Sequence, residues 1–232
     1  MNVSSRDLAQ AAKVHIFDVD HTLTNRATGR RYALAGVKQR IFYRRELFQL
    51  PFMYLKYRLG RLPLQSVTKE IRSLKGRTYE ELSRLAHSTF EESIKGDIFP
   101  DARAHLAMCR EVGVPIILAS SSFDVILEPL RDHLAVDHMI CSELAYQDNV
   151  ATGWFVGGPC YAEVKAERIA YYLGTQGIAP GDVAFYSDSF HDLPSLDLVG
   201  HPVAVNPDKL LELRARQDGW PIMHWRLTTP EG

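Results

Sequence analysis

Cysteine, net charge and long apolar runs are all scarce in this sequence. The 232-residue chain has three cysteines, which are widely spaced and form no CxxC pair, so neither a disulfide framework nor a zinc-ribbon site is expected. Its 27 basic and 28 acidic residues give a net charge of -1, which provides no bulk attraction for nucleic acid. No segment reaches the roughly 20 apolar residues of a membrane span. We therefore expect free, buried thiols and no nucleic-acid partner.

The chain does have enough apolar residues for a sizeable core. Hydrophobic residues make up 46% of it, as in folded globular proteins, and the length suits one domain with a smaller accessory unit. The first 13 residues lack the apolar stretch of a secretory signal. We expect a cytoplasmic protein.

Short β-prone runs alternate with helical patterns. Strands are expected over 14–17, 114–119, 138–141, 183–186 and 202–205. Helices are expected up to Gly113, over 123–134, over 162–173, and from Pro207 with Asn206 as its cap. Asp148-Asn149 lies between two further β-like segments, which predicts a hairpin. This alternation predicts an α/β fold with a doubly wound parallel sheet of five or more strands.

The stretch from 25 to 97 has a different pattern, which is helical throughout. Thr78 and Glu81 have the spacing of a capping box ahead of an apolar helix face. We therefore expect a core domain made of residues 1–24 and 98–232, and a helical cap domain over 25–97.

Polar side chains follow three of the expected strands. Asp18 and Asp20 come at the end of the first strand, Ser120 follows the second, and Asp188 follows a later one. In open parallel sheets, ligands bind outside the carboxyl ends of the strands. The sequence therefore predicts a reaction centre at this edge.

The residue types at this edge suit phosphoryl transfer. Two nearby carboxylates that share a metal can hold different protonation states, so one of Asp18 and Asp20 can attack while the other transfers a proton. Asp188 and Asp192 add hard oxygen atoms, which favour Mg²⁺ over zinc. Lys165 and a serine hydroxyl are suited to the negative charge of a transferring phosphoryl group.

In their order along the chain, these residues resemble the four motifs of the haloacid dehalogenase superfamily. The motifs are Asp18-x-Asp20-x-Thr22, a strand ending in Ser120, a later Lys165, and Asp188-x-x-x-Asp192. Segments 160–165 and 188–194 are similar to those of the phosphoserine-phosphatase-like subgroup, subfamily IB. The resemblance covers nearly the whole chain and implies a Rossmann-like core with a small helical cap.

The resemblance also implies an activity. It predicts a Mg²⁺-dependent phosphatase that hydrolyses a phosphate monoester through an aspartyl-phosphate intermediate. Asp18 would be the nucleophile, and Asp20 would protonate the leaving alcohol and then activate water. Asp18, the backbone carbonyl of Asp20, and Asp188 would hold the metal.

Four further residues receive supporting roles from the resemblance. Asp192 would orient the water shell of the metal without touching it. Ser120 would hold a phosphate oxygen, and Lys165 would neutralise the nucleophile and the phosphoryl group. Thr22 completes the phosphate-binding set and would support the loop through its hydroxyl.

Alternatives remain at several positions. Ser121 or Ser122 is also suited to the phosphate role of Ser120. His21 and Ser187 stand where glycine is common in the superfamily, and each would narrow the entrance or alter the loop geometry.

Substrate recognition is less defined. Arg26, Arg30 and Arg31 would bind a carboxylate or a second phosphate, or form a solvated basic face. The first acidic residue after the first motif is Glu46, later than in phosphoserine phosphatases, which argues against phosphoserine. The apolar and basic segment 47–62 suits either the core of the cap or peripheral contact with a membrane.

The expected substrate is a small phosphorylated metabolite, such as an amino-alcohol or sugar phosphate, or a lipid headgroup phosphate. Two other functions fit the same residues. One is a catalytically silent module that binds phosphate, and the other is a phosphotransferase that uses an alcohol in place of water.

Overall fold

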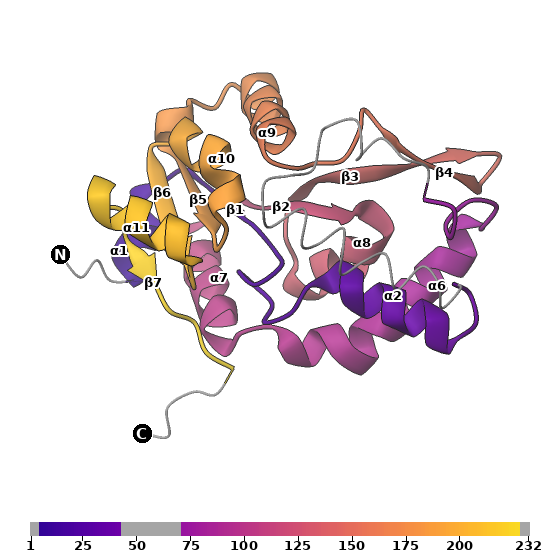
Figure 1. The fold of residues 1–232 in the computed structure, drawn as a ribbon. Helices are drawn as coiled ribbons and strands as arrows, with labels where there is room; N and C mark the ends of the chain where they lie inside the picture. Colours follow the sequence, from indigo (N-terminus) through magenta and orange to yellow (C-terminus); the bar gives the residue numbers. More distant parts are fainter. Residues whose placement is uncertain (1–4, 43–70, 228–232) are drawn as a thin grey trace.

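A seven-stranded sheet forms the centre of the molecule, with helices on both faces (Figure 1). The computed structural model describes residues 5–42 and 71–227. The strands are β1 (Val14–Phe17), β2 (Ile116–Phe123), β3 (His138–Gln147), β4 (Val150–Val156), β5 (Val183–Ser187), β6 (His201–Val205) and β7 (Ile222–Met223). They lie in the order β4-β3-β2-β1-β5-β6-β7, and only β3 and β4 pair antiparallel. The predicted α/β fold is confirmed.

The helices divide between the two faces of this sheet. They are α1 (Ser5–Ala11), α2 (Thr28–Lys38), α6 (Tyr79–Thr89), α7 (Pro100–Val112), α8 (Asp124–Leu134), α9 (Glu163–Gln176), α10 (Leu193–Leu198) and α11 (Lys209–Asp218). Phe17 and Leu118 pack with α1, α7 and α8, whereas Ile16 and Ile117 pack with α9, α10 and α11. Neighbouring residues of one strand thus enter opposite cores, which is the pattern of a doubly wound sheet.

The order of the strands locates the edge where a ligand would bind. From β1 the chain passes outward through β2 and β3, and it later returns to the other side of β1 with β5, β6 and β7. The strand order therefore reverses at β1 and β5. Ligands of doubly wound sheets bind at such a reversal, outside the carboxyl ends of the strands.

The helices of the predicted cap pack against the outer part of the sheet. Thr78 caps α6, and both hydrogen bonds of the predicted capping box with Glu81 are present. The segment 71–79 hydrogen-bonds to β4, with Ile71 N donating to Gly153 O and Gly76 N to Ala151 O. Segment 47–62 and Glu46 lie outside the described residues.

Several sequence predictions needed correction at their boundaries. The strand predicted over 114–119 begins at Ile116 and continues through three serines to Phe123. The predicted cap of the last helix was wrong. Asp208, not Asn206, is the N-cap of α11, and its side chain accepts hydrogen bonds from two backbone N–H groups. The Asn206 side chain instead accepts a hydrogen bond from Trp225 N, at 2.9 Å.

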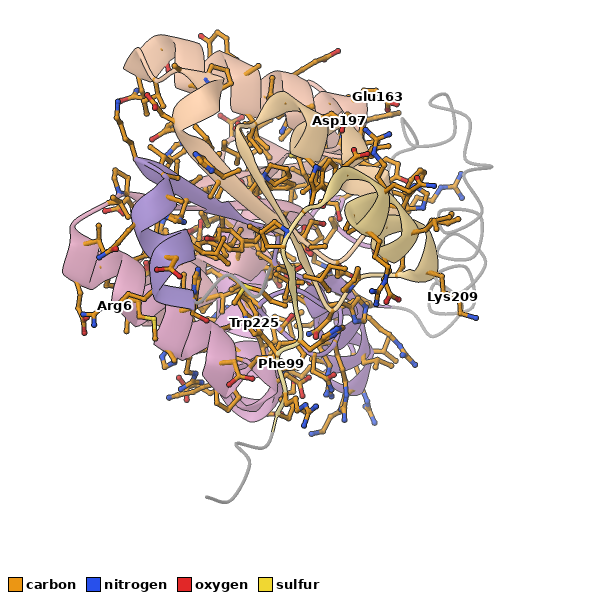
Figure 2. All side chains as sticks on the ribbon, turned by 90° about the vertical axis from the view of Figure 1, so that its left-hand side faces the viewer. Arg6, Phe99, Glu163, Asp197, Lys209 and Trp225 are labelled. Carbon is orange, nitrogen blue, oxygen red and sulfur yellow. The ribbon has the colours of Figure 1, made fainter. Side chains whose placement is uncertain are left out.

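The C-terminal aromatics cover the core, as predicted. Trp225, which Figure 2 shows with Phe99, is 6% exposed and belongs to the same buried cluster as Phe99. Trp220 packs against the cluster on the other face. Across ranges 5–42 and 71–227, no helix is both long and apolar enough to cross a membrane.

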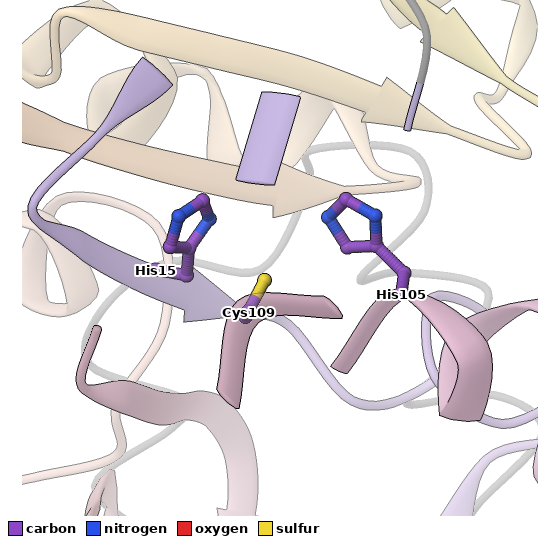
Figure 3. Close-up of side chains that lie close together, drawn as sticks. All are labelled: His15, His105 and Cys109. Atoms are coloured by element: carbon purple, nitrogen blue, oxygen red, sulfur yellow. The ribbon is translucent and has the colours of Figure 1, made fainter. Parts of the chain in front are cut away.

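His15 of β1, Tyr186 of β5 and His105 of α7 form a buried hydrogen-bonded chain. Figure 3 shows the two histidines together with Cys109. His15 Nε2 lies 3.2 Å from the Ala9 carbonyl, which can only accept, so this nitrogen carries the proton. His15 Nδ1 then accepts from the Tyr186 hydroxyl, at 3.0 Å. The Tyr186 oxygen in turn accepts from His105 Nε2, at 3.1 Å. Hydrogen bonding thus fixes the tautomers of both histidines.

Cys109 lies beside these rings. In the part of the chain that the structure describes, His15, His105 and Cys109 are the one group of three or more His, Cys or carboxylate residues whose ligand atoms lie within 4.8 Å of one another. Both nitrogens of His15 and Nε2 of His105 already make hydrogen bonds within the core. We therefore interpret the group as a structural network and not as a metal centre.

This network makes the stability of the protein sensitive to acid. Burial lowers the pKa of both His15 and His105 to about 4, from 6.5. Below pH 6.5 the unfolded chain binds protons that the folded chain does not, so the free energy of unfolding falls as the pH falls toward 4. At pH 5 the expected loss is about 2 kcal/mol for each histidine.

Urea denaturation at pH 7 and pH 5 checks this expectation. In the variant His105→Gln, which can still donate to Tyr186, the difference between the two pH values should shrink by about 2 kcal/mol. An unchanged difference would mean that His105 does not titrate on unfolding.

Candidate active site

Asp18 lies at the carboxyl end of β1, at the point where the strand order reverses. Its backbone N donates to the carbonyl of Tyr186 on β5, at 2.9 Å, which continues the β1–β5 ladder. The Asp18 side chain is 9% exposed. The sheet therefore fixes this carboxylate at the edge where a ligand is expected.

Lys165 reaches this carboxylate from the first turn of α9. Its Nζ lies 2.8 Å from Asp18 Oδ1, and 2.8 Å and 2.9 Å from the two carboxylate oxygens of Asp192. The lysine is 2% exposed. Ala162, which precedes α9, has φ 47 and ψ -118, and such a positive φ is costly for a residue with a side chain. One buried ammonium thus joins two acidic residues of the predicted set.

Burial and charge govern protonation at this site. Burial raises the pKa of Asp18 to about 7, although the Lys165 ammonium acts in the opposite direction. Burial and the negative charges of Asp18 and Asp192 raise the pKa of Asp188 well above its usual range. Burial alone would lower the pKa of Lys165, but its two carboxylate partners raise it well above the usual value. The carboxylates thus outnumber the cation, so a bound divalent cation would favour their charged forms.

Asp188 and Asp192 are held by hydroxyl groups. The Thr22 hydroxyl donates to Asp188 Oδ1 at 3.3 Å and accepts from the Asp188 backbone N at 2.9 Å. Ser187 Oγ donates to Asp192 Oδ2 at 2.7 Å. Thr22 is fully buried, which suits the predicted support of the loop.

Asp20 has a different set of partners. Its Oδ1 accepts from the backbone N of Thr28 at 2.8 Å and from the Thr28 hydroxyl at 2.7 Å. The Ser122 hydroxyl lies 2.8 Å from Thr28 Oγ1 and 3.4 Å from Asp20 Oδ2. The Asp20 carboxylate thus lies at the N-terminus of α2. This arrangement suits the prediction that Asp20 would offer a metal its backbone carbonyl and keep its carboxylate for proton transfer.

The three consecutive serines have distinct surroundings. Ser120 is 1% exposed, and its hydroxyl accepts from the backbone N of Ser122 at 3.1 Å, so its own proton can be donated to a ligand. Ser122 is engaged with Thr28 and Asp20. The carbonyl of Ser121 accepts from Ser142 Oγ, at 2.9 Å. Ser120 thus keeps a hydroxyl proton for the predicted phosphate role, whereas the Ser122 hydroxyl is engaged with Thr28 and Asp20.

The two positions where glycine was expected differ from each other. His21 has φ 65, the left-handed conformation that glycine adopts without strain, and its Nδ1 lies 3.1 Å from Asn25 O. Ser187 is a regular strand residue at the end of β5. His21 thus keeps a backbone conformation typical of glycine, whereas Ser187 adds a hydroxyl that contacts Asp192.

The three arginines that follow the nucleophile loop differ in their surroundings. Arg31 forms an ion pair with Asp97, at 2.7 Å, and is 22% exposed. Arg26 and Arg30 are exposed. The Arg31 guanidinium is therefore already paired with the Asp97 carboxylate. Arg26 and Arg30 are the two of the three that fit the predicted recognition of an anion.

The structure brings the predicted residues to this edge in three hydrogen-bonded groups, which are Lys165 with Asp18 and Asp192, Thr22 with Asp188, and Asp20 with Thr28, Ser122 and Ser120. Sequence reasoning missed Thr28, which contacts Asp20, and the bond between Ser187 and Asp192. The available signal was a threonine at the start of an apolar helical pattern, which is common at helix N-termini. That signal does not reveal its partner.

The family of the chain follows from comparison with known sequences. A family model described as haloacid dehalogenase-like hydrolase matches residues 16–197. The chain belongs to this family of hydrolases, as its motifs predicted.

Two relatives refine the comparison. The chain is 30% identical over 217 residues to a histidinol-phosphatase from Neisseria meningitidis, with 91% of this chain and 98% of that protein covered. It is 26% identical over 226 residues to phosphoserine phosphatase SerB1 from Mycobacterium tuberculosis, with 95% and 72% covered. These matches place the chain near the phosphoserine-phosphatase-like subgroup, in agreement with the predicted resemblance.

Solved structures show the same fold. A protein of unknown function from Bordetella pertussis Tohama I has a TM-score of 0.82 and 26% identity, covering 94% of this chain and 100% of that one. A substrate-bound phosphoserine phosphatase has a TM-score of 0.66 and 19% identity, covering 91% and 92%.

Proposed function

We propose that this hydrolase is a Mg²⁺-dependent phosphatase that acts on a small phosphate monoester through an aspartyl-phosphate intermediate. The observation that carries the proposal is the buried Lys165, which joins Asp18 and Asp192 at the point where the strand order reverses. A nucleophilic carboxylate beside a fixed cation suits attack on phosphorus, because charge must be neutralised as the phosphoryl group transfers.

The residues at the site fit a magnesium ion. Asp18 and Asp188 supply hard carboxylate oxygens, and the Asp20 carbonyl would complete the protein ligands. Lys165 bonds Asp18 through Oδ1, so Oδ2 remains for a metal. Asp188 carries no ion pair with Lys or Arg in the described residues, and burial together with neighbouring negative charge raises its pKa. When bound, Mg²⁺ would neutralise the phosphoryl oxygens and the crowded carboxylates.

Each remaining residue takes a role that its contacts support. Asp18 attacks phosphorus, and Asp20 protonates the leaving alcohol and then takes a proton from water. Ser120 donates its free hydroxyl proton to a phosphate oxygen, and Asp192 holds Lys165 in place. Residues 25–97 act as a cap over this edge, joined to the core domain of residues 1–24 and 98–232.

The substrate is a small phosphorylated metabolite. The name of the Neisseria meningitidis relative makes histidinol phosphate the first compound to test, and that of SerB1 adds phosphoserine. The assay is Mg²⁺-dependent release of phosphate from a panel of these two esters, a sugar phosphate and lysophosphatidic acid. Preference for one small ester, with release abolished by a chelator and restored by Mg²⁺, is the expected result.

The same assay separates the other functions. A folded protein that binds Mg²⁺ but releases no phosphate from any ester would favour the silent phosphate-binding module. Release of alcohol without an equal amount of phosphate, in the presence of an alcohol acceptor, would favour the phosphotransferase.

A further inference from the structure

The Asp20 carboxylate is held by residues from two distant parts of the chain. Thr28, the first residue of α2, donates twice to Asp20 Oδ1, through its backbone N at 2.8 Å and its hydroxyl at 2.7 Å. Thr28 is 1% exposed, so water cannot easily replace these donors. The N-terminus of an 11-residue helix adds a partial positive charge beside the carboxylate. The first residue of α2 therefore fixes the orientation of the Asp20 carboxylate, in addition to the loop that carries Asp20.

Ser122 braces this arrangement from β2. Its hydroxyl lies 2.8 Å from Thr28 Oγ1 and 3.4 Å from Asp20 Oδ2, and the residue is 8% exposed. A hydroxyl group has one proton to donate. Thr28 donates its proton to Asp20 Oδ1, and the single proton of Ser122 is shared between Asp20 Oδ2 and Thr28 Oγ1. A residue 94 positions away from Thr28 thus contacts both its hydroxyl and the Asp20 carboxylate.

We propose that Thr28 and Ser122 are positioning residues that fix the carboxylate of Asp20 for proton transfer to the leaving alcohol. The inference rests on the proposed phosphatase function. A positioned acid contributes about 10²–10⁴-fold to the rate, and displacement by about 1 Å can remove 10²-fold. Thr28 and Ser122 also link Asp20 to α2 and β2. The Asp20 carboxylate therefore has the orientation needed for proton transfer only while α2 packs against β2.

The test compares two esters that need the acid to different degrees. An alkyl phosphate leaves as a poor alkoxide and requires a proton, whereas p-nitrophenyl phosphate leaves as a stabilised phenolate and does not. The variant Thr28→Val keeps the backbone donor and the side-chain shape but lacks the hydroxyl. We expect the rate of alcohol release in the first turnover, which reports formation of the intermediate, to fall about 10–100-fold on the best alkyl ester of the panel. The first-turnover release of p-nitrophenolate should fall less than about 3-fold, because this leaving group needs little proton transfer. Hydrolysis of the intermediate, in which Asp20 takes a proton from water, is common to both esters and does not enter this first-turnover rate.

Controls separate positioning from general damage. KM for the alkyl ester should stay within about 2-fold, because the hydroxyl pair does not bind substrate. Thr28→Ser restores the hydroxyl and should restore the first-turnover rate. Ser122→Ala removes the brace without adding volume and should show the same dependence on the leaving group. Asp20→Asn should show a larger dependence of the rate on the leaving group.

Equal losses of the first-turnover rate on both esters in Thr28→Val and in Ser122→Ala would overturn the inference and leave the proposed function intact. Failure of the unmodified protein to hydrolyse either ester would remove the proposed function, and this inference with it.

Discussion

Replacement of Asp18 by Asn is expected to lower kcat by about 10⁴-fold or more on every ester that the protein hydrolyses. The amide has the shape of the carboxylate but cannot attack phosphorus. Unlike Thr28→Val, this variant should lose activity on alkyl and aryl esters alike, because the leaving group of either ester departs only as Asp18 attacks phosphorus. Steady-state phosphate release with the substrate panel measures the effect.

The stability of Asp18→Asn provides its control. Burial raises the pKa of Asp18 to about 7, so the ionised carboxylate destabilises the fold, and this cost grows as the pH rises from 3.8 to 7. The variant avoids that cost but gives up one charged partner of Lys165. We expect it to stay folded, and to gain stability relative to the unmodified protein between pH 4 and 7. Residual activity above about 1% would place the nucleophile elsewhere.

Replacement of Lys165 by Met is expected to lower the free energy of unfolding by about 3–5 kcal/mol. Methionine has a similar length, but it leaves Asp18 and Asp192 buried without their shared cation. The kcat should fall by about 10²–10³-fold as well, because a fixed positive charge at the phosphoryl group is lost. Urea denaturation at pH 7 and steady-state kinetics measure the two effects.

A second substitution tests the cause of this instability. If unpaired negative charge is responsible, adding Asp192→Asn to the Lys165→Met variant should recover part of the lost free energy of unfolding. No recovery, together with a loss below about 1 kcal/mol for Lys165→Met alone, would show that the ion pair contributes little to the fold.

Local patterns predicted much of the fold. The capping box of Thr78 and Glu81 and the hairpin turn at Asp148-Asn149 are each set by residues within four positions, and the structure contains both. Where distant contacts decide the outcome, the sequence was a poorer guide. The strand β2 continues through Ser120, Ser121 and Ser122 because the site satisfies their polar groups, whereas consecutive serines usually indicate a loop.

The same distinction applies to the site. The order and spacing of the motifs predicted Asp18, Lys165 and Asp192 as members of one centre, and the structure joins them within hydrogen-bonding distance. The contact of Thr28 with Ser122 joins residues 94 positions apart. Nothing within either local sequence indicates the other, so only the packing of α2 against β2 could reveal it.

The packing of α6 has a consequence for engineering. A third apolar cluster contains Leu82 and Leu85 of α6, but also Val125 of α8, Leu144 of β3 and Ala151 of β4. In its described residues, 25–42 and 71–97, the region 25–97 thus shares an apolar cluster with the hairpin and α8.

A chimera that takes only residues 25–97 from a relative would set foreign apolar side chains against the native hairpin, and mismatched packing of this kind destabilises a protein. A graft intended to change substrate preference should therefore include 138–156 and the first turn of α8. When these segments are exchanged together, the apolar side chains of the shared cluster all come from one protein.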